Sequence, residues 1–244
     1  MARSSAQRVF QALPRAKGAH RAAPRPVPLA AVVAQRIREA IVEGRFALGE
    51  ALSELKLAAA LNVSRTPVRA ALTALQHQGL IDVRPRAGSY VFLPSEEDVA
   101  ELAEFRRVIE AAALRFGHAR RRDEALRQMQ EADDAMARAR DLDDRLAFSR
   151  ADTAFHQAIV ENSANEHLID AYRLVSGRVA ALRTHNLLAA RTIRDDALAE
   201  HRTVMAAFAK NDLATAEAVL SEHIWRLRPR FQAARARQAG EPSR

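Results

Sequence analysis

From Ser95 to about residue 236, apolar residues recur at intervals of three and four, which is the spacing of one face of an α-helix. Polar turn residues break the pattern at 162–165, Asn-Ser-Ala-Asn, and again at Asn211-Asp212. This stretch shows neither the alternating pattern of a β-strand nor an internal repeat. It therefore predicts an all-helical antiparallel bundle of six helices over residues 95–236, with 237–244 as a tail.

The residues before the bundle predict a different, smaller fold. Helical spacing covers three short stretches between Leu29 and Gly79. Two strands then follow, Ile81–Arg84 and Tyr90–Leu93, with a basic turn between them. Three helices and a hairpin make the layout of a winged helix-turn-helix, to which we assign residues 29–94. The whole chain is thus predicted to be mainly α.

Positive charge is concentrated ahead of the bundle. Residues 1–95 hold 14 Lys and Arg against 5 Asp and Glu, a net +9, whereas residues 96–244 hold 24 against 25, a net −1. This asymmetry predicts an anionic partner for the N-terminal part. Residues 1–28 are basic and proline-rich with no acid, so we expect a disordered tail. A solvated tail is the favoured interpretation, and the alternatives are a tail that touches phosphates or a segment upstream of the true start.

Composition excludes several classes of protein. The chain has no cysteine, which excludes a disulfide scaffold, a Cys-ligated zinc finger, an iron–sulfur cluster and a thiol nucleophile. No apolar run reaches the roughly 18 residues that a membrane span needs. The first residues also lack the compact apolar stretch of a secretory signal. We therefore expect a cytoplasmic protein without a membrane partner.

The stretch 63–72, Val-Ser-Arg-Thr-Pro-Val-Arg-Ala-Ala-Leu, carries the predicted DNA-binding residues. Ser64 is placed to cap a helix whose free N–H groups can bind a DNA phosphate, and Thr66 lies in its first turn. Arg65 and Arg69 are four apart and share the polar face, from which a guanidinium can donate two parallel hydrogen bonds to guanine. Taken alone, the two arginines are equally compatible with a solvated helix face.

Residues 29–93 resemble the winged helix-turn-helix of the GntR family of bacterial transcription regulators. The resemblance implies operator DNA as partner, with Arg86 at the hairpin tip placed for the minor groove or the backbone. Two positions depart from the family pattern. Ala70 stands where a glutamate is usual, and Leu55-Lys56 stand where some members carry a DNA-contacting arginine, so Lys56 is expected to contact phosphate only. The matching positions are Leu52-Ser53-Glu54, Leu57-Ala58, 63–72, Leu75, Gly79-Leu80, Pro85, Gly88 and Val91.

Four polar residues fall on helix faces that a bundle should keep apolar. Asp152 and His156 are i, i+4 neighbours, while His201 and His223 lie on the apolar faces of two later helices. Buried groups without partners cost about 1–3 kcal/mol each. A divalent cation would satisfy all four, and three imidazoles with one carboxylate suit zinc first, and nickel, manganese or iron. Spacing alone also allows unrelated core histidines, each bonded to a neighbour.

Residues 96–236 look like the FCD domain, the helical effector domain of the FadR subfamily. Residues 152–156, Asp-Thr-Ala-Phe-His, match its D-x-x-F-H motif, and His201 and His223 match two later histidine motifs. The resemblance implies that Asp152, His156, His201 and His223 hold a metal, to which a small carboxylate effector binds. Arg106 is expected to pair with the effector carboxylate or with Glu110, and Arg183 is a second candidate for the effector.

These features predict a ligand-responsive transcription regulator. Dimerisation through the helical domain would place two DNA-binding domains on a pseudo-palindromic operator. One alternative is a metal-dependent hydrolase with a basic DNA-binding appendage, because open metal positions can activate water. No residue outside the four ligands is clearly placed as its general base. Another alternative is a non-specific DNA binder, which would show no large preference for a selected sequence.

Overall fold

The structure is a computed structural model that describes residues 27–187 and 191–240. The chain divides into two compact units after Leu93. The predicted basic tail at residues 1–28 lies almost entirely outside the described residues. Within them, no helix is both long and apolar enough to cross a lipid bilayer.

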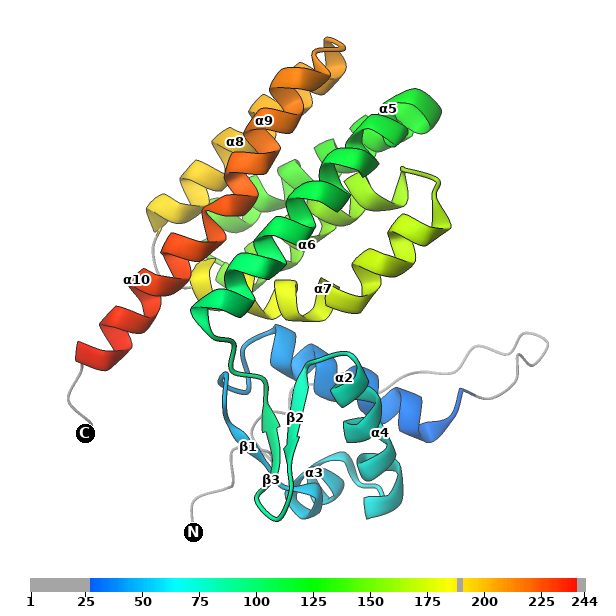
Figure 1. Cartoon of the computed structure of the whole chain (residues 1–244), viewed down its shortest axis with the longest axis vertical. Helices are drawn as coiled ribbons and strands as arrows, with labels where there is room; N and C mark the ends of the chain where they lie inside the picture. The colour runs from blue at the N-terminus through cyan, green and yellow to red at the C-terminus, as the bar shows by residue number, and fades with distance from the viewer. Residues whose placement is uncertain (1–26, 188–190, 241–244) are drawn as a thin grey trace. The chain divides into compact units, whose positions relative to one another are not determined.

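The first unit has the predicted winged helix-turn-helix fold (Figure 1). Its strands form an antiparallel sheet in the order β1-β3-β2, with Arg84 opposite Gly88 at the end of the hairpin. The short strand β1 was not predicted, because its two residues are too few to show an alternating pattern. The elements are α2 (Leu29–Val42), β1 (Ala51–Leu52), α3 (Glu54–Leu61), α4 (Arg65–His77), β2 (Ile81–Arg84) and β3 (Gly88–Val91).

Local sequence explains how α3 and α4 are joined. Ser53 caps α3, its side chain accepting a hydrogen bond from the backbone N–H of Lys56. Asn62 ends α3 in the left-handed conformation, at φ 54°, which an asparagine tolerates better than most residues. The apolar face of α4 is fully buried, through Val68 and Leu75 among others. The tight turn and the buried face together fix which side of α4 remains exposed.

The second unit is the predicted helical bundle. In Figure 1, α8 and α9 run side by side in opposite directions. The first helix is one element of 46 residues, which kinks at Arg121, where φ is −145° and ψ is 42°. The elements are α5 (Glu96–Asp141), α6 (Arg145–Glu161), α7 (Glu166–Leu187), α8 (Arg191–Ala209), α9 (Leu213–Trp225) and α10 (Leu227–Gly240).

One prediction for this unit was wrong. One helix was expected between the break at Asn211-Asp212 and the tail predicted from residue 237, but this stretch breaks at Arg226 into α9 and α10. Pro229 gives the physical reason, since its nitrogen carries no hydrogen for the Trp225 carbonyl and its ring crowds that group. A proline is tolerated in the first turn of a new helix. The last helix also continues to Gly240, past the predicted end at 236.

A large apolar cluster, drawn from α5, α6, α7, α8 and α9, fills the second unit. Polar side chains nevertheless lie buried in this unit, which is unusual for charged groups without a function or a partner. They include Arg106, Glu110, Asp152, His156, Arg183, His201 and His223.

Candidate metal centre and nucleic-acid interface

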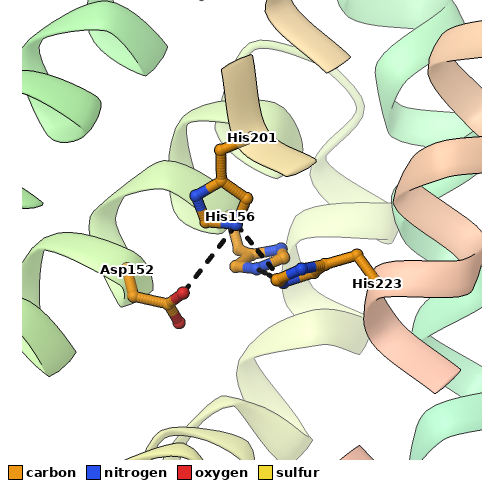
Figure 2. A group of neighbouring side chains, drawn as sticks. All are labelled: Asp152, His156, His201 and His223. Carbon is orange, nitrogen blue, oxygen red and sulfur yellow. Dashed lines mark hydrogen bonds and ion pairs between the residues drawn. The ribbon is translucent and has the colours of Figure 1, made fainter. Parts of the chain in front are cut away.

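The four predicted metal ligands lie together in the second unit (Figure 2). One donor atom from each of Asp152, His156, His201 and His223 lies within 4.8 Å of the others, and all four residues are buried. The Nε2 atom of His223 is 3.3 Å from Nε2 of His156 and 3.3 Å from Nε2 of His201. The Oδ1 atom of Asp152 is 3.8 Å from Nε2 of His201.

Three helices bring these residues together. Asp152 and His156 are one turn apart on the buried face of α6, while α8 supplies His201 and α9 supplies His223. The His201 ring is stacked on Phe155, with centroids 3.8 Å apart and planes 3° from parallel. This apolar wall fixes the ring, so that its Nε2 points at the other donors.

Two glutamates outside the cluster fix the protons of the histidines. Glu110 Oε2 lies 2.5 Å from Nδ1 of His156, and Glu200 Oε2 lies 2.7 Å from Nδ1 of His223. Both Nδ1 atoms must therefore donate their hydrogen to a carboxylate. Arg106 Nη2 also lies 3.2 Å from Nδ1 of His156. A lone pair on that nitrogen, however, would face a carboxylate oxygen at only 2.5 Å.

This proton assignment leaves the inner nitrogens as acceptors. With Nδ1 protonated, Nε2 of His156 and Nε2 of His223 carry lone pairs that face each other across 3.3 Å. A proton on Nε2 of His201 could be donated to Nε2 of His223. It would leave the two acceptor nitrogens of His223 and His156 facing each other. A cation bound by all the lone pairs resolves this conflict, so the donor set fits a metal ion.

Electrostatics favour the metal-binding form of the histidines. Burial lowers the pKa of His156 well below 6.5, and the nearby Arg183 and Arg106 lower it further. Burial likewise lowers the pKa of His201 well below 6.5, followed by the effects of His223, Arg183 and Arg106. Both rings are therefore neutral at pH 7, as metal ligation requires.

A small cavity of about 30 Å³ adjoins the cluster. A cavity needs roughly 10–15 Å³ to hold a single water molecule, so this space suits one small polar group such as a carboxylate. Asp152 and His223 form the side of the cavity next to the cluster. The remaining lining residues are Arg106, Arg183, Ile193, Ala197, Ile224, Leu227 and Arg230.

The three arginines of the cavity differ in how well they are paired. Arg106 donates through Nε to Glu110 Oε1 at 2.7 Å and is almost fully buried. Arg183 Nε lies 3.2 Å from Asp152 Oδ2, which is ion-pair distance, although that oxygen has no well-aligned hydrogen bond. Arg230 lies 3.9 Å from Asp196. The sequence prediction included Arg106 and Arg183 but missed Arg230.

Two histidines outside the cluster, His118 and His185, are partly buried. Burial lowers the pKa of His185. His118 packs edge-on against Phe208, at 4.9 Å between centroids, and its Nε2 is buried.

The predicted DNA-binding residues lie on exposed surfaces of the first unit. Arg65, Thr66 and Arg69 line a shallow depression on α4, opposite its buried apolar face. Ser64 occupies the N-cap position of α4, but its side chain makes no capping hydrogen bond. Its hydroxyl is therefore left for another partner.

Lys56 and Arg86 are also exposed, on α3 and at the hairpin tip, where Arg86 has a φ of 64°. Among the described residues, no hydrogen bond or ion pair joins Lys56 or Arg86 to the arginines of α4. Arg65 and Arg69 therefore lie together on α4, whereas Lys56 and Arg86 are separate from them.

Glu54, the first residue of α3, joins the two arginines of α4. Arg69 donates to its Oε1 through Nε and to its Oε2 through Nη2, both at 3.0 Å, and Arg65 donates to Oε2 through Nη2 at 3.2 Å. The hydrogen bond from Arg69 is the main reason that the pKa of Glu54 is lowered. The sequence analysis assigned no role to this glutamate.

The chain is similar to known regulatory proteins. The family model for bacterial regulatory proteins of the gntR family matches residues 29–91, and the model for the FCD domain matches residues 101–226. A probable D-xylose utilization operon transcriptional repressor of Paenarthrobacter nicotinovorans is 30% identical over 79% of this chain and 85% of its own length. The Uxu operon transcriptional regulator of Escherichia coli is 27% identical over 82% and 85%.

Solved structures show the same relationship. A putative transcriptional regulator GntR from Rhodococcus sp. RHA1 is 25% identical and superposes with a TM-score of 0.76, over 85% of this chain and 99% of that one.

Proposed function

This chain belongs to the gntR family of bacterial regulatory proteins and carries an FCD domain, and from that premise we propose a ligand-responsive repressor or activator whose signal is a small carboxylate. It is a DNA-binding transcription regulator. Its relatives are transcriptional regulators and not enzymes, which removes the hydrolase alternative. Such a protein acts where the chromosome is, in the cytoplasm.

The N-terminal unit would read operator DNA through the exposed face of α4. Arg65 and Arg69 would donate to base edges in the major groove, with Ser64 and Thr66 on the adjacent phosphates. Lys56 and Arg86 would contact the backbone, or in the case of Arg86 the minor groove. A homodimer would place two such units on two half-sites of a pseudo-palindrome.

Asp152, His156, His201 and His223 would hold one divalent metal, with zinc the first candidate and nickel, manganese and iron the others. When bound, this metal would supply a Lewis-acid position for a ligand oxygen. Glu110 and Glu200 would keep the His156 and His223 rings in the ligating tautomer.

A carboxylate group of the effector would occupy the adjacent cavity. Arg106 and Arg183 would bind it by charge-assisted hydrogen bonds, each giving up part of its contact with Glu110 or Asp152. The cavity volume of about 30 Å³ suits the carboxylate group itself. A longer effector would therefore extend past the lining side chains and move them.

The observation that carries this proposal is the 3.3 Å distance between Nε2 of His156 and Nε2 of His223, in two rings whose Nδ1 atoms each contact a glutamate. Metal content is the direct test, on protein purified without a tag or chelator. We expect about one metal per chain in the wild type and none in His201→Ala. His167→Ala, at an exposed position of α7, is the matched control and should retain the metal. Metal-free wild type, even after supplying zinc, nickel and manganese, would overturn the metal site.

Regulation is tested with DNA obtained by selection from a random duplex library. Small mono- and dicarboxylates are then added to the metal-loaded complex, and operator affinity is measured. The proposal expects at least one of them to change that affinity in the wild type but not in Asp152→Ala. An equal response in Asp152→Ala would separate the effector from the metal site.

A further inference from the structure

We propose that Glu54 determines DNA specificity by positioning Arg65 and Arg69 for base recognition. This inference rests on the proposed reading of operator bases by those two arginines. It adds a residue from another helix, since Glu54 begins α3 and the arginines lie in the first turns of α4.

The geometry shows which donors of Arg69 are engaged. A guanidinium has two edges that can each donate a parallel pair of N–H bonds, Nε with Nη2 and Nη1 with Nη2. Glu54 accepts from Nε and Nη2 at 3.0 Å each. The Nη1–Nη2 edge is therefore left free, and it is the edge at the tip of the side chain. Two parallel donors on that edge match O6 and N7 of guanine.

The same carboxylate also restricts Arg65. Its Nη2 reaches Glu54 Oε2 at 3.2 Å, and that oxygen also accepts from Arg69 Nη2. One glutamate thus fixes the distance between two guanidinium groups. Long flexible side chains lose rotamer entropy when they bind a base, and a side chain already held in place loses less.

Stability does not account for this contact. The Arg65 and Arg69 side chains are 60% and 67% exposed, and Glu54 is 26% exposed. Ion pairs in such surroundings contribute little to folding because water screens them. A carboxylate on a face that meets phosphates also opposes DNA association in general. A glutamate here therefore lowers affinity for any DNA, and the proposal places its compensating effect in the choice of sequence.

The test compares two duplexes of equal length, one selected from a random library by the wild type and one with the same bases scrambled. Affinities for both are measured for the full-length wild type, Glu54→Gln, Glu54→Asp and Arg69→Ala, with thermal melting as a check on folding. Glu54→Asp keeps the charge but shortens the reach by one methylene. Glu39→Gln, on α2 with Gln35 as its partner, is the control for a change of one charge in the same unit.

We expect Glu54→Gln to bind the scrambled duplex as well as or better than the wild type, and to bind the selected duplex more weakly. The ratio of the two affinities should fall at least fivefold, since one good bidentate base contact is worth roughly 5- to 150-fold in discrimination. The ratio of the two affinities should also fall in Glu54→Asp, although the charge of the side chain is unchanged. In the Arg69→Ala background, Glu54→Gln should lower the ratio little further, because the residue through which it acts is gone.

Equal tightening on both duplexes in Glu54→Gln, as expected for Glu39→Gln, would overturn the proposal and leave Glu54 as a screening charge. A Glu54→Asp variant with the wild-type ratio would overturn it too. Failure of the proposed function is visible separately. It would appear as equal binding of both duplexes by the wild type, or as an unchanged ratio in Arg69→Ala, whatever Glu54 does.

Discussion

The Nε2 atom of His156 lies 3.3 Å from the Nε2 atom of His223, while the opposite nitrogen of each ring contacts a glutamate. Two neutral imidazoles in this arrangement cannot hydrogen-bond to each other through these nitrogens. The relationship makes the outer glutamates part of the proposed metal site, although neither lies in the cluster itself.

Removing an outer glutamate should weaken metal binding without removing a ligand. Glu200→Gln exchanges the carboxylate at Nδ1 of His223 for an amide and should lower metal affinity about 10- to 100-fold. Competition with a chromophoric chelator measures the change. Glu131→Gln, exposed on α5, should bind metal like the wild type. A wild-type affinity in Glu200→Gln would show that the glutamate does not orient the ring.

The metal-free protein should lose stability as the pH falls below about 6.5. Burial lowers the pKa of His156 and of His201 in the folded state, so below 6.5 the unfolded chain binds protons that the folded chain does not. Each of the two sites should cost about 1.4 kcal/mol per pH unit until its folded pKa is reached. Urea unfolding of chelator-treated protein between pH 7.5 and 5.5 measures this slope. A His201→Phe variant should show a shallower slope, and an unchanged slope would contradict the assignment.

Arg69 and Lys56 should fail in different ways when they are truncated. Arg69→Ala is expected to relax base preference at one position of each half-site, at a cost of about 1–3 kcal/mol. Lys56→Ala should instead weaken binding to all sequences and reduce the slope of log affinity against log salt by about one. Selection from degenerate duplexes and a salt titration distinguish the two. Uniform weakening in Arg69→Ala would make Arg69 a phosphate contact.

Arg230 should affect the effector response and not the metal. It lines the cavity but lies 3.9 Å from Asp196, so its charge is less fully paired than that of Arg106. Arg230→Gln is expected to lower the affinity for an active carboxylate about tenfold, in line with the loss of a charge-assisted hydrogen bond. Isothermal titration into metal-loaded protein measures this. Arg228→Gln, an exposed neighbour on α10, is the control, and equal losses in both variants would refute a specific contact.

The sequence predicted those features that depend on local spacing. Helical periodicity and cap residues predicted the two kinds of unit, and polar residues on apolar faces predicted that Asp152, His156, His201 and His223 lie together. The break before α10 could also have been predicted, because Pro229 is a direct signal against a continuous helix.

The supporting residues could not be predicted, since they depend on how helices pack. Glu54 lies 11 and 15 residues from the arginines that it contacts, and Glu110 lies 46 residues from His156. Such pairs have no fixed spacing in sequence. Each becomes visible only when the helices that carry them are placed in three dimensions.

The break at Arg226 makes α10 a helix of its own, which lines the cavity through Arg230 while Gln232 donates to Glu96 at 2.6 Å. Residues two positions apart on a helix, such as Arg230 and Gln232, point to nearly opposite sides, about 200° apart. Glu96 is the first residue of α5, just after the boundary at Leu93. One side of α10 thus faces the cavity, and the other contacts the start of α5, so a ligand that displaced Arg230 would also disturb the contact with Glu96.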